Sequence, residues 1–113
     1  MQKNRKELRD AYKEKPKRGG IYVILNSKNG RYLLSSTLDI DGARNRFGFA
    51  VKVDSCVDYL LTKDWKEFGA SAFSLEVLEE MTMKPEQTSQ EFAEDLKVLL
   101  SFWKEKYDPA LSY

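Results

Sequence analysis

A tyrosine and two arginines are the side chains in this sequence best suited to contact a phosphate group. Tyr22 lies in a β-branched and aromatic run, and Arg44 and Arg46 lie in a later segment that favours a helix. A guanidinium group can donate two parallel hydrogen bonds to phosphate oxygens, so either arginine is a candidate phosphate ligand. The competing interpretation is that both arginines are solvated and that Tyr22 is a half-buried hairpin aromatic.

Thiol and zinc chemistry have little support in the sequence. The single cysteine, Cys56, cannot form an internal disulfide, and no residue suggests itself as its base partner. The chain contains no histidine, so a Cys/His zinc site is not available. We therefore expect no structural metal and no cofactor.

The charges are segregated along the chain although the net charge is only +1. Residues 74–95 carry six Glu and one Asp against one Lys, whereas residues 1–18 carry eight basic and three acidic residues. A basic segment of this kind can bind a polyanion, and the acidic segment would repel phosphate. The alternative is that both are solvated surfaces. The candidate nucleic-acid-binding residues are Lys3, Arg5, Lys6, Arg9, Lys13, Lys15, Lys17 and Arg18.

Composition and length predict one soluble globular domain. The chain has 113 residues, 42% hydrophobic and 33% charged, which suits a single hydrophobic core rather than a disordered chain. No apolar run is long enough to span a membrane, and the basic N-terminus leads into no signal-peptide core. We expect a cytoplasmic protein with no membrane partner.

Periodicity and turn residues predict the elements that position these side chains. Residues 3–15 consist of strong helix formers and end at Pro16. Residues 20–25 and 31–34 predict two strands joined by a turn with an Asn-Gly step, which is a β-hairpin signal. Asp39 or Asp41 can cap a short helix that runs to about Ala50.

The second half of the chain predicts two more helices and one strand. Asp54 or Ser55 can open a helix that ends at Gly69, and residues 73–78 predict a strand that joins the hairpin. Residues 79–87 predict a loop, and Thr88 to Glu91 form a capping-box pattern that opens a last helix. The expected fold is α+β: residues 19–113 form a three-stranded antiparallel sheet flanked by helices, and residues 1–18 form a basic helical extension.

The order of several short motifs resembles the GIY-YIG nuclease superfamily over nearly all of residues 19–107. These motifs are Gly20-Ile21-Tyr22, Asn29-Gly30-Arg31 followed by Tyr32-Leu33-Leu34-Ser35-Ser36, the block from Leu61 to Gly69, Phe73 with Glu76-Val77-Leu78-Glu79, and Phe102-Trp103. The resemblance implies a fold of this type. It also implies DNA hydrolysis by tyrosines, a first-helix arginine and a divalent metal held by a glutamate.

The family's functional positions are only partly kept in this chain. Tyr22 matches the first family tyrosine, and either Arg44 or Arg46 matches the arginine. Leu33, Ser35 and Leu100 stand where the resemblance places a second tyrosine, a glycine and the metal-binding glutamate. We expect Tyr22 to share a sheet face with Leu33 and to lie near Leu100.

These replacements predict a noncatalytic module that binds nucleic-acid backbones. One alternative is a divergent active endonuclease that uses Tyr22, Arg44 or Arg46 and an unrecognised carboxylate, with Mg²⁺ or Mn²⁺ as the metal. Another is a protein-interaction module whose charged segments are both partner surfaces.

Overall fold

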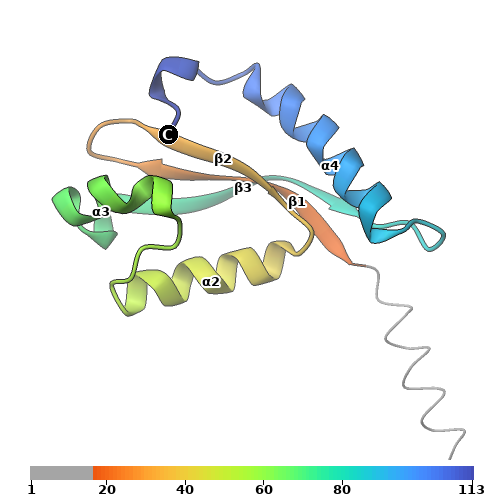
Figure 1. The fold of residues 1–113 in the computed structure, drawn as a ribbon, viewed down its shortest axis with the longest axis horizontal. Helices are drawn as coiled ribbons and strands as arrows, with labels where there is room; N and C mark the ends of the chain where they lie inside the picture. Colours follow the sequence, from red (N-terminus) through yellow and green to blue (C-terminus); the bar gives the residue numbers. More distant parts are fainter. Residues whose placement is uncertain (1–16) are drawn as a thin grey trace, which may run out of the picture.

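A computed structural model describes residues 17–113 of the chain (Figure 1). Its main elements are β1 (Arg18–Asn26), β2 (Tyr32–Thr37), α2 (Ile40–Lys52), α3 (Thr62–Phe68), β3 (Phe73–Thr82) and α4 (Ser89–Lys104). Short 3₁₀ turns η1 (Tyr59–Leu61), η2 (Ala70–Ala72) and η3 (Pro109–Leu111) link or follow them. The α+β fold with three antiparallel strands is confirmed, while the helix expected over residues 3–15 lies outside the described residues.

The predicted β-hairpin is confirmed, with longer strands than the sequence indicated. Asn26 Oδ1 accepts a hydrogen bond from the Lys28 amide at 2.9 Å, and the Asn26 carbonyl accepts one from the Gly30 amide at 2.9 Å. Gly30 adopts a φ of 75°, which glycine reaches without a Cβ clash. The turn residues therefore close the hairpin in the way the Asn-Gly step predicted.

The third strand is four residues longer than expected. β3 pairs antiparallel with β1 from Asn26 opposite Phe73 to Arg18 opposite Thr82, which gives the strand order β2-β1-β3. The expectation that residues 79–87 form a loop is therefore wrong at its start. Because β1 begins at Arg18, it offers backbone partners to Glu79 and Glu80, and their side chains remain in solvent.

The first helix after the hairpin begins where the sequence indicated. Of the two candidate caps, Asp39 is the one used, since its Oδ1 accepts a hydrogen bond from the Gly42 amide at 3.0 Å. The next prediction is wrong, because no helix begins at Asp54 or Ser55. Asp54 has a φ of 52°, a left-handed conformation that interrupts the helical path, and α3 begins only at Thr62.

The last helix has the predicted capping box. The Thr88 side chain accepts from the Glu91 amide, and the Glu91 side chain accepts from the Thr88 amide. The helix ends at Lys104. Further along the chain, Asp108 caps η3, where its Oδ1 accepts from the Ala110 amide at 3.0 Å.

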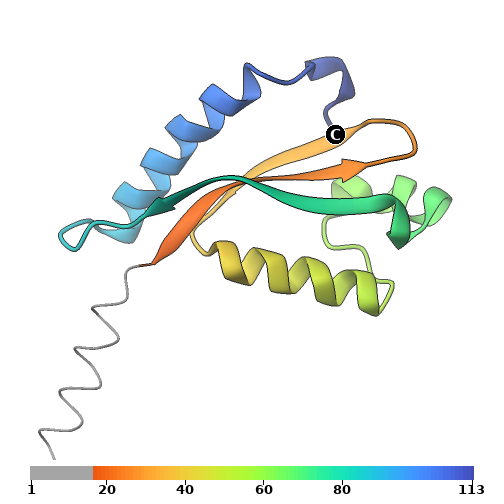
Figure 2. The same cartoon turned by 180° about the vertical axis from the view of Figure 1, so that it is seen from behind.

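The sheet separates two hydrophobic clusters, and helices cover each of its faces (Figure 2). On one face, Ala50 of α2, Leu61 of η1 and Trp65 of α3 pack with strand residues. On the other face, α4 packs over Ile21 and Val23 of β1. No helix within residues 17–113 is long and apolar enough to cross a membrane.

Candidate functional site

Tyr22 lies on the central strand and faces α2 and α3. It is half-buried, and its backbone pairs with Ser35 on one side and Val77 on the other. Tyr22 and Leu33 both pack in the first cluster, so they share a sheet face as predicted. Ser35, where the resemblance places a glycine, is the direct cross-strand partner of Tyr22. Tyr22 and Ser35 thus bring two hydroxyl groups side by side on the sheet face that carries α2 and α3.

Leu33 occupies the position of a second tyrosine but lies in the hydrophobic core. Only 9% of its surface is exposed, and it packs in the cluster that contains Ile24 and Trp65. A leucine offers no hydroxyl to a phosphate. This position therefore contributes packing and no acid or base.

Leu100 packs against the opposite face of the sheet. It belongs with Leu99 and Trp103 to the residues that cover the second cluster, whereas Tyr22 packs in the first. The packing therefore does not support the expectation that Leu100 lies near Tyr22. The physical reason is that α4 turns its apolar stripe towards Ile21 and Val23, which alternate with Tyr22 along β1.

The residues present do not fit a divalent cation at the position where the resemblance places one. Leu100 has no donor atom. Over residues 17–113, no group of three or more His, Cys, Asp and Glu side chains is arranged to hold a metal ion.

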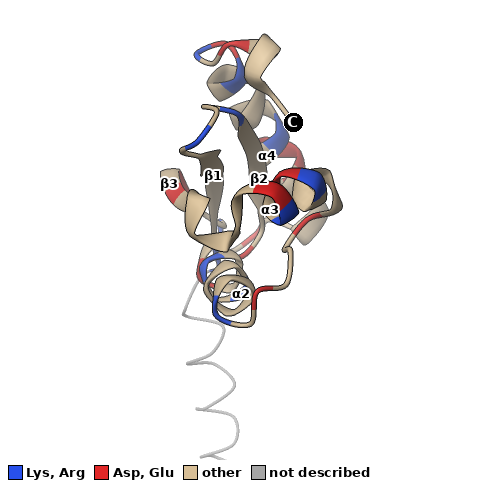
Figure 3. Cartoon of the chain, turned by 90° about the vertical axis from the view of Figure 1, so that its left-hand side faces the viewer, with Lys and Arg blue, Asp and Glu red and all other residues tan. Residues whose placement is uncertain are grey.

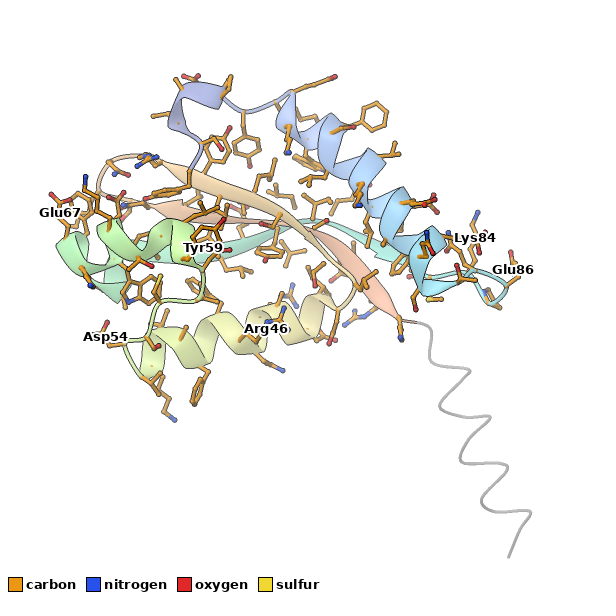
Figure 4. All side chains as sticks on the ribbon, in the orientation of Figure 1. Arg46, Asp54, Tyr59, Glu67, Lys84 and Glu86 are labelled. Atoms are coloured by element: carbon orange, nitrogen blue, oxygen red, sulfur yellow. The ribbon has the colours of Figure 1, made fainter. Side chains whose placement is uncertain are left out.

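The two candidate arginines lie on the surface of α2. Arg44 Nη1 is 3.9 Å from Asp41 Oδ1, a pair one helical turn apart with both side chains more than half exposed. Arg46 is exposed as well, and Figure 4 shows it on the middle part of the helix. The side of α2 that packs on the sheet instead carries Ala43, Phe47 and Ala50. Apolar side chains thus occupy the inner side of this helix.

Arg18 is already engaged by two carboxylates. Its Nη2 donates to Asp41 Oδ2 at 2.7 Å, and its Nη1 lies 3.6 Å from Glu80 Oε2. The hydrogen bond to Asp41 and the charge of that carboxylate raise the pKa of Arg18. Lys17 is exposed beside it, and the other six basic residues of the N-terminal segment lie outside the described residues. The structure describes two basic residues of this segment, Lys17 and Arg18. Lys17 is exposed and has no ion-pair partner within residues 17–113.

A buried carboxylate that the sequence analysis missed organises the turn end of the hairpin. Asp64 on α3 is 6% exposed. Its Oδ2 accepts hydrogen bonds from the Tyr113 hydroxyl at 2.6 Å, from Asn29 Nδ2 at 2.9 Å and, over a longer 3.4 Å, from Asn26 Nδ2. Arg31 Nη1 lies 3.8 Å away. These contacts connect α3, the hairpin turn and residue 113.

The hydrogen bonds at Asp64 shift the ionisation of the groups that share them. The Tyr113 hydroxyl, followed by the Asn29 amide, lowers the pKa of the Asp64 carboxyl despite its burial. Burial, together with the Asp64 hydrogen bond, raises the pKa of the Tyr113 phenol. The Arg31 guanidinium lies 4.2 Å from the centroid of the Tyr113 ring. The group therefore contains an ionised carboxylate and a protonated phenol, and it serves as a structural anchor.

The charge differs between the two halves of the described chain. Residues 17–72 contain nine Lys and Arg against six Asp and Glu, whereas residues 73–113 contain four against nine. The first half includes α2, α3 and the hairpin, and the second half includes β3 and α4. Figure 3 shows lysines and arginines on the hairpin turn, α2 and α3, interspersed with acidic residues. A polyanion is therefore better matched to the first half of the described chain than to the second.

Two solved structures share this arrangement of strands and helices. A structure of the catalytic domain of the homing endonuclease I-TevI matches 84% of this chain and 95% of its own, with 22% identity and a TM-score of 0.57. A mutant of the same intron endonuclease domain matches 79% of this chain and 82% of its own, with 19% identity and a TM-score of 0.55. The fold is GIY-YIG-like. No protein-family model and no curated protein sequence matches the chain.

Proposed function

We propose that this chain is a noncatalytic GIY-YIG-type module that binds the phosphate backbone of nucleic acids. The observation that carries the proposal is the packing of Leu33, which the resemblance places at a catalytic tyrosine position, in the core beside Ile24 and Trp65. The two similar structures belong to a protein named an endonuclease, and that activity is a property of that protein. The packing in this chain supports binding without cleavage.

Phosphodiester hydrolysis needs a base, a source of positive charge and, in this family, a metal. Tyr22 alone remains of the two tyrosines, and Leu100 stands where the resemblance places the metal-binding glutamate. Loss of one acid or base group typically lowers the rate by a factor of about 10² to 10⁴. Loss of the base and the metal together would leave cleavage far below a useful rate.

Binding of a phosphate backbone requires positively charged side chains and no catalytic groups. Arg44 and Arg46 are exposed on α2, in the half of the described chain with excess positive charge. The eight basic residues of positions 1–18 would add phosphate contacts, although Arg18 is already paired with Asp41. Such contacts follow the backbone and carry no base specificity, so affinity is expected to fall steeply with salt.

A nicking assay combined with a salt titration tests this function. Supercoiled plasmid with Mg²⁺ or Mn²⁺ is expected to show no nicking above the buffer control. Replacing Lys3, Arg5 and Lys6 by Gln should reduce the slope of log affinity against log salt for duplex DNA by about 2 to 3, because each lost phosphate contact removes about 0.9. The matched control replaces Lys84, Lys97 and Lys104, in the half with excess negative charge, and should leave the slope unchanged.

Two results would contradict the proposal in different ways. Metal-dependent nicking that Tyr22→Phe abolishes would establish a divergent nuclease instead. Absence of binding to both duplex and single-stranded DNA at low salt would exclude a nucleic-acid module and leave a protein-interaction role.

A further inference from the structure

The outer edge of β2 includes backbone groups that have no hydrogen-bond partner within residues 17–113. Along an antiparallel pair, successive residues direct their amide and carbonyl alternately towards the partner strand and away from it. The Asn26 amide of β1 donates to the Arg31 carbonyl at 2.9 Å, so by alternation Leu34 and Ser36 direct their amide and carbonyl outward. No other residue of the described chain forms a backbone hydrogen bond with them on that side.

The chain itself shows that this edge accepts another extended segment. Ser112 pairs in parallel with Tyr32, and the Tyr113 amide donates to the Tyr32 carbonyl at 2.9 Å, beside the start of β2 (Figure 1). Among the described residues, no further backbone hydrogen bond to this edge follows. The contact therefore covers only the start of the strand, and the open part of the edge runs from Leu34 to Thr37.

β2 lacks the features by which edge strands usually avoid pairing with another molecule. These features are charged side chains, proline and β-bulges. Residues 32–37 contain no charged residue and no proline, and their register with β1 is continuous. The other edge strand differs, because β3 exposes Glu76, Glu79 and Glu80 and its pairing with β1 contains a bulge. β2 is thus the edge at which the sheet can be extended.

A second copy of β2 is complementary to this edge. When the two strands run antiparallel with Leu34 of each copy opposite Ser36 of the other, the outward amide of each residue meets the outward carbonyl of its counterpart. Neither strand carries a charge, so no like charges face each other across the pair. The net charge of +1 adds little repulsion between whole molecules. The β3 edge of another copy is a poorer match because its glutamates and bulge disfavour pairing.

We propose that two copies of this chain associate through their β2 edges, with residues 34–37 of both strands paired antiparallel about a twofold axis. This axis is perpendicular to the sheet, so the assembly closes at two copies and keeps both α2 helices on one face. The contact is a single strand pair and is smaller than a stable interface, so the dissociation constant is on the order of 0.1 to 1 mM. Nucleic acid takes no part in it, so the proposal does not depend on the proposed function.

Sedimentation equilibrium of the full chain at neutral pH, from about 10 μM to about 1 mM, tests this inference. The weight-average mass should rise over this range from that of a monomer towards that of a dimer. NMR spectra locate the contact, since the amide resonances of residues 34–37 should shift with protein concentration. The outward amide protons of Leu34 and Ser36 should also exchange with solvent more slowly as the dimer forms.

Two variants at Ser36 block the edge in different ways. Ser36→Pro removes an outward amide that takes no part in the β1–β2 pairing, and it should weaken association by at least about tenfold. Ser36→Glu adds a charge to the edge and should weaken association to a similar degree, which provides a second test if the proline variant does not fold. Ser74→Glu makes the same change on β3 and is the control, which should leave the dissociation constant unchanged. Circular dichroism checks that each variant is folded.

Three results would overturn the inference. A monomer over the whole concentration range would show that the β2 edges do not pair. A mass that rises beyond that of a dimer would show open, head-to-tail association in place of the twofold pair. A dimer that the folded Ser36 variants retain would show that the copies associate through another surface. Nucleic-acid binding is measured separately, so its failure would leave this inference standing.

Discussion

Replacing Asp64 by Asn removes the charge on which three side-chain donors converge. The two short hydrogen bonds, from Tyr113 at 2.6 Å and Asn29 at 2.9 Å, end on a carboxylate that is 6% exposed. Hydrogen bonds to a charged group contribute about 1.5 to 3 kcal/mol, against about 0.5 to 1.5 for neutral pairs. The loss of about 1 kcal/mol at each bond predicts that the free energy of unfolding falls by about 2 kcal/mol.

A double-mutant cycle shows whether the Tyr113 contact accounts for this loss. Tyr113→Phe removes the phenolic donor and should cost about 1 to 2 kcal/mol, and the double variant should cost less than the sum by about 1 kcal/mol. Urea unfolding monitored by circular dichroism measures all four proteins, provided that the m-value stays constant. Glu67→Gln, an exposed carboxylate on the same helix, is the control and should change stability by less than about 0.5 kcal/mol. Strict additivity of Asp64→Asn and Tyr113→Phe would refute the coupling.

Three further predictions concern acid stability and two glycine positions. The folded state lowers the pKa of Asp64, so ionisation of this carboxyl stabilises the fold at pH values above the unfolded carboxylate pKa of about 3.9. This stabilisation is lost as the pH falls through the lower pKa of the folded state. The free energy of unfolding should therefore fall less on acidification in Asp64→Asn than in the unmodified protein. Gly69 has φ 83° and ψ 161°, a region largely restricted to glycine, so Gly69→Ala should destabilise by about 1 to 3 kcal/mol in urea unfolding. Gly48 lies in the interior of α2 with open space around it, so Gly48→Ala should instead raise the free energy of unfolding by about 0.5 to 1 kcal/mol.

Local signals in the sequence predicted the elements that local chemistry determines. The Asn-Gly step predicted the hairpin, and Thr88 with Glu91 predicted the start of α4, because turn and cap hydrogen bonds join residues a few positions apart. The motif order likewise predicted the GIY-YIG-like fold and the shared face of Tyr22 and Leu33. Alternation along each strand, together with the register that the hairpin turn sets, places these two residues on one face without reference to the rest of the fold.

The errors arose where distant residues determine the local structure. Asp54 was a plausible helix cap by type, but its Oδ1 accepts from Trp65 Nε1 at 3.2 Å, and its left-handed backbone separates α2 from the next turn. β3 continues to Thr82 because the neighbouring strand, β1, begins at Arg18 and pairs with it there. No local pattern marks Asp64 as a buried carboxylate, since its partner Tyr113 is 49 positions away. Leu100 packs in the second cluster because of the way α4 crosses the sheet, which the sequence pattern does not indicate.

The strand order leaves two sheet edges, β2 and β3, which have different surroundings. At β2, residue 112 pairs with Tyr32, and the Tyr113 amide donates to the Tyr32 carbonyl at 2.9 Å. At β3, the outer edge has no strand partner among residues 17–113, but it carries the exposed Glu76, Glu79 and Glu80.

The acidic edge of β3 governs how copies of this molecule behave at high concentration. A net charge of +1 gives almost no overall repulsion between copies at neutral pH, and such proteins tend to associate. The glutamates oppose edge-to-edge pairing locally, and the bulge between Ile21 and Tyr22 adds twist to the β1–β3 pair. These glutamates and the bulge are therefore the features of β3 that oppose extension of the sheet from one molecule to the next; without them the unpaired edge would be a template for another strand.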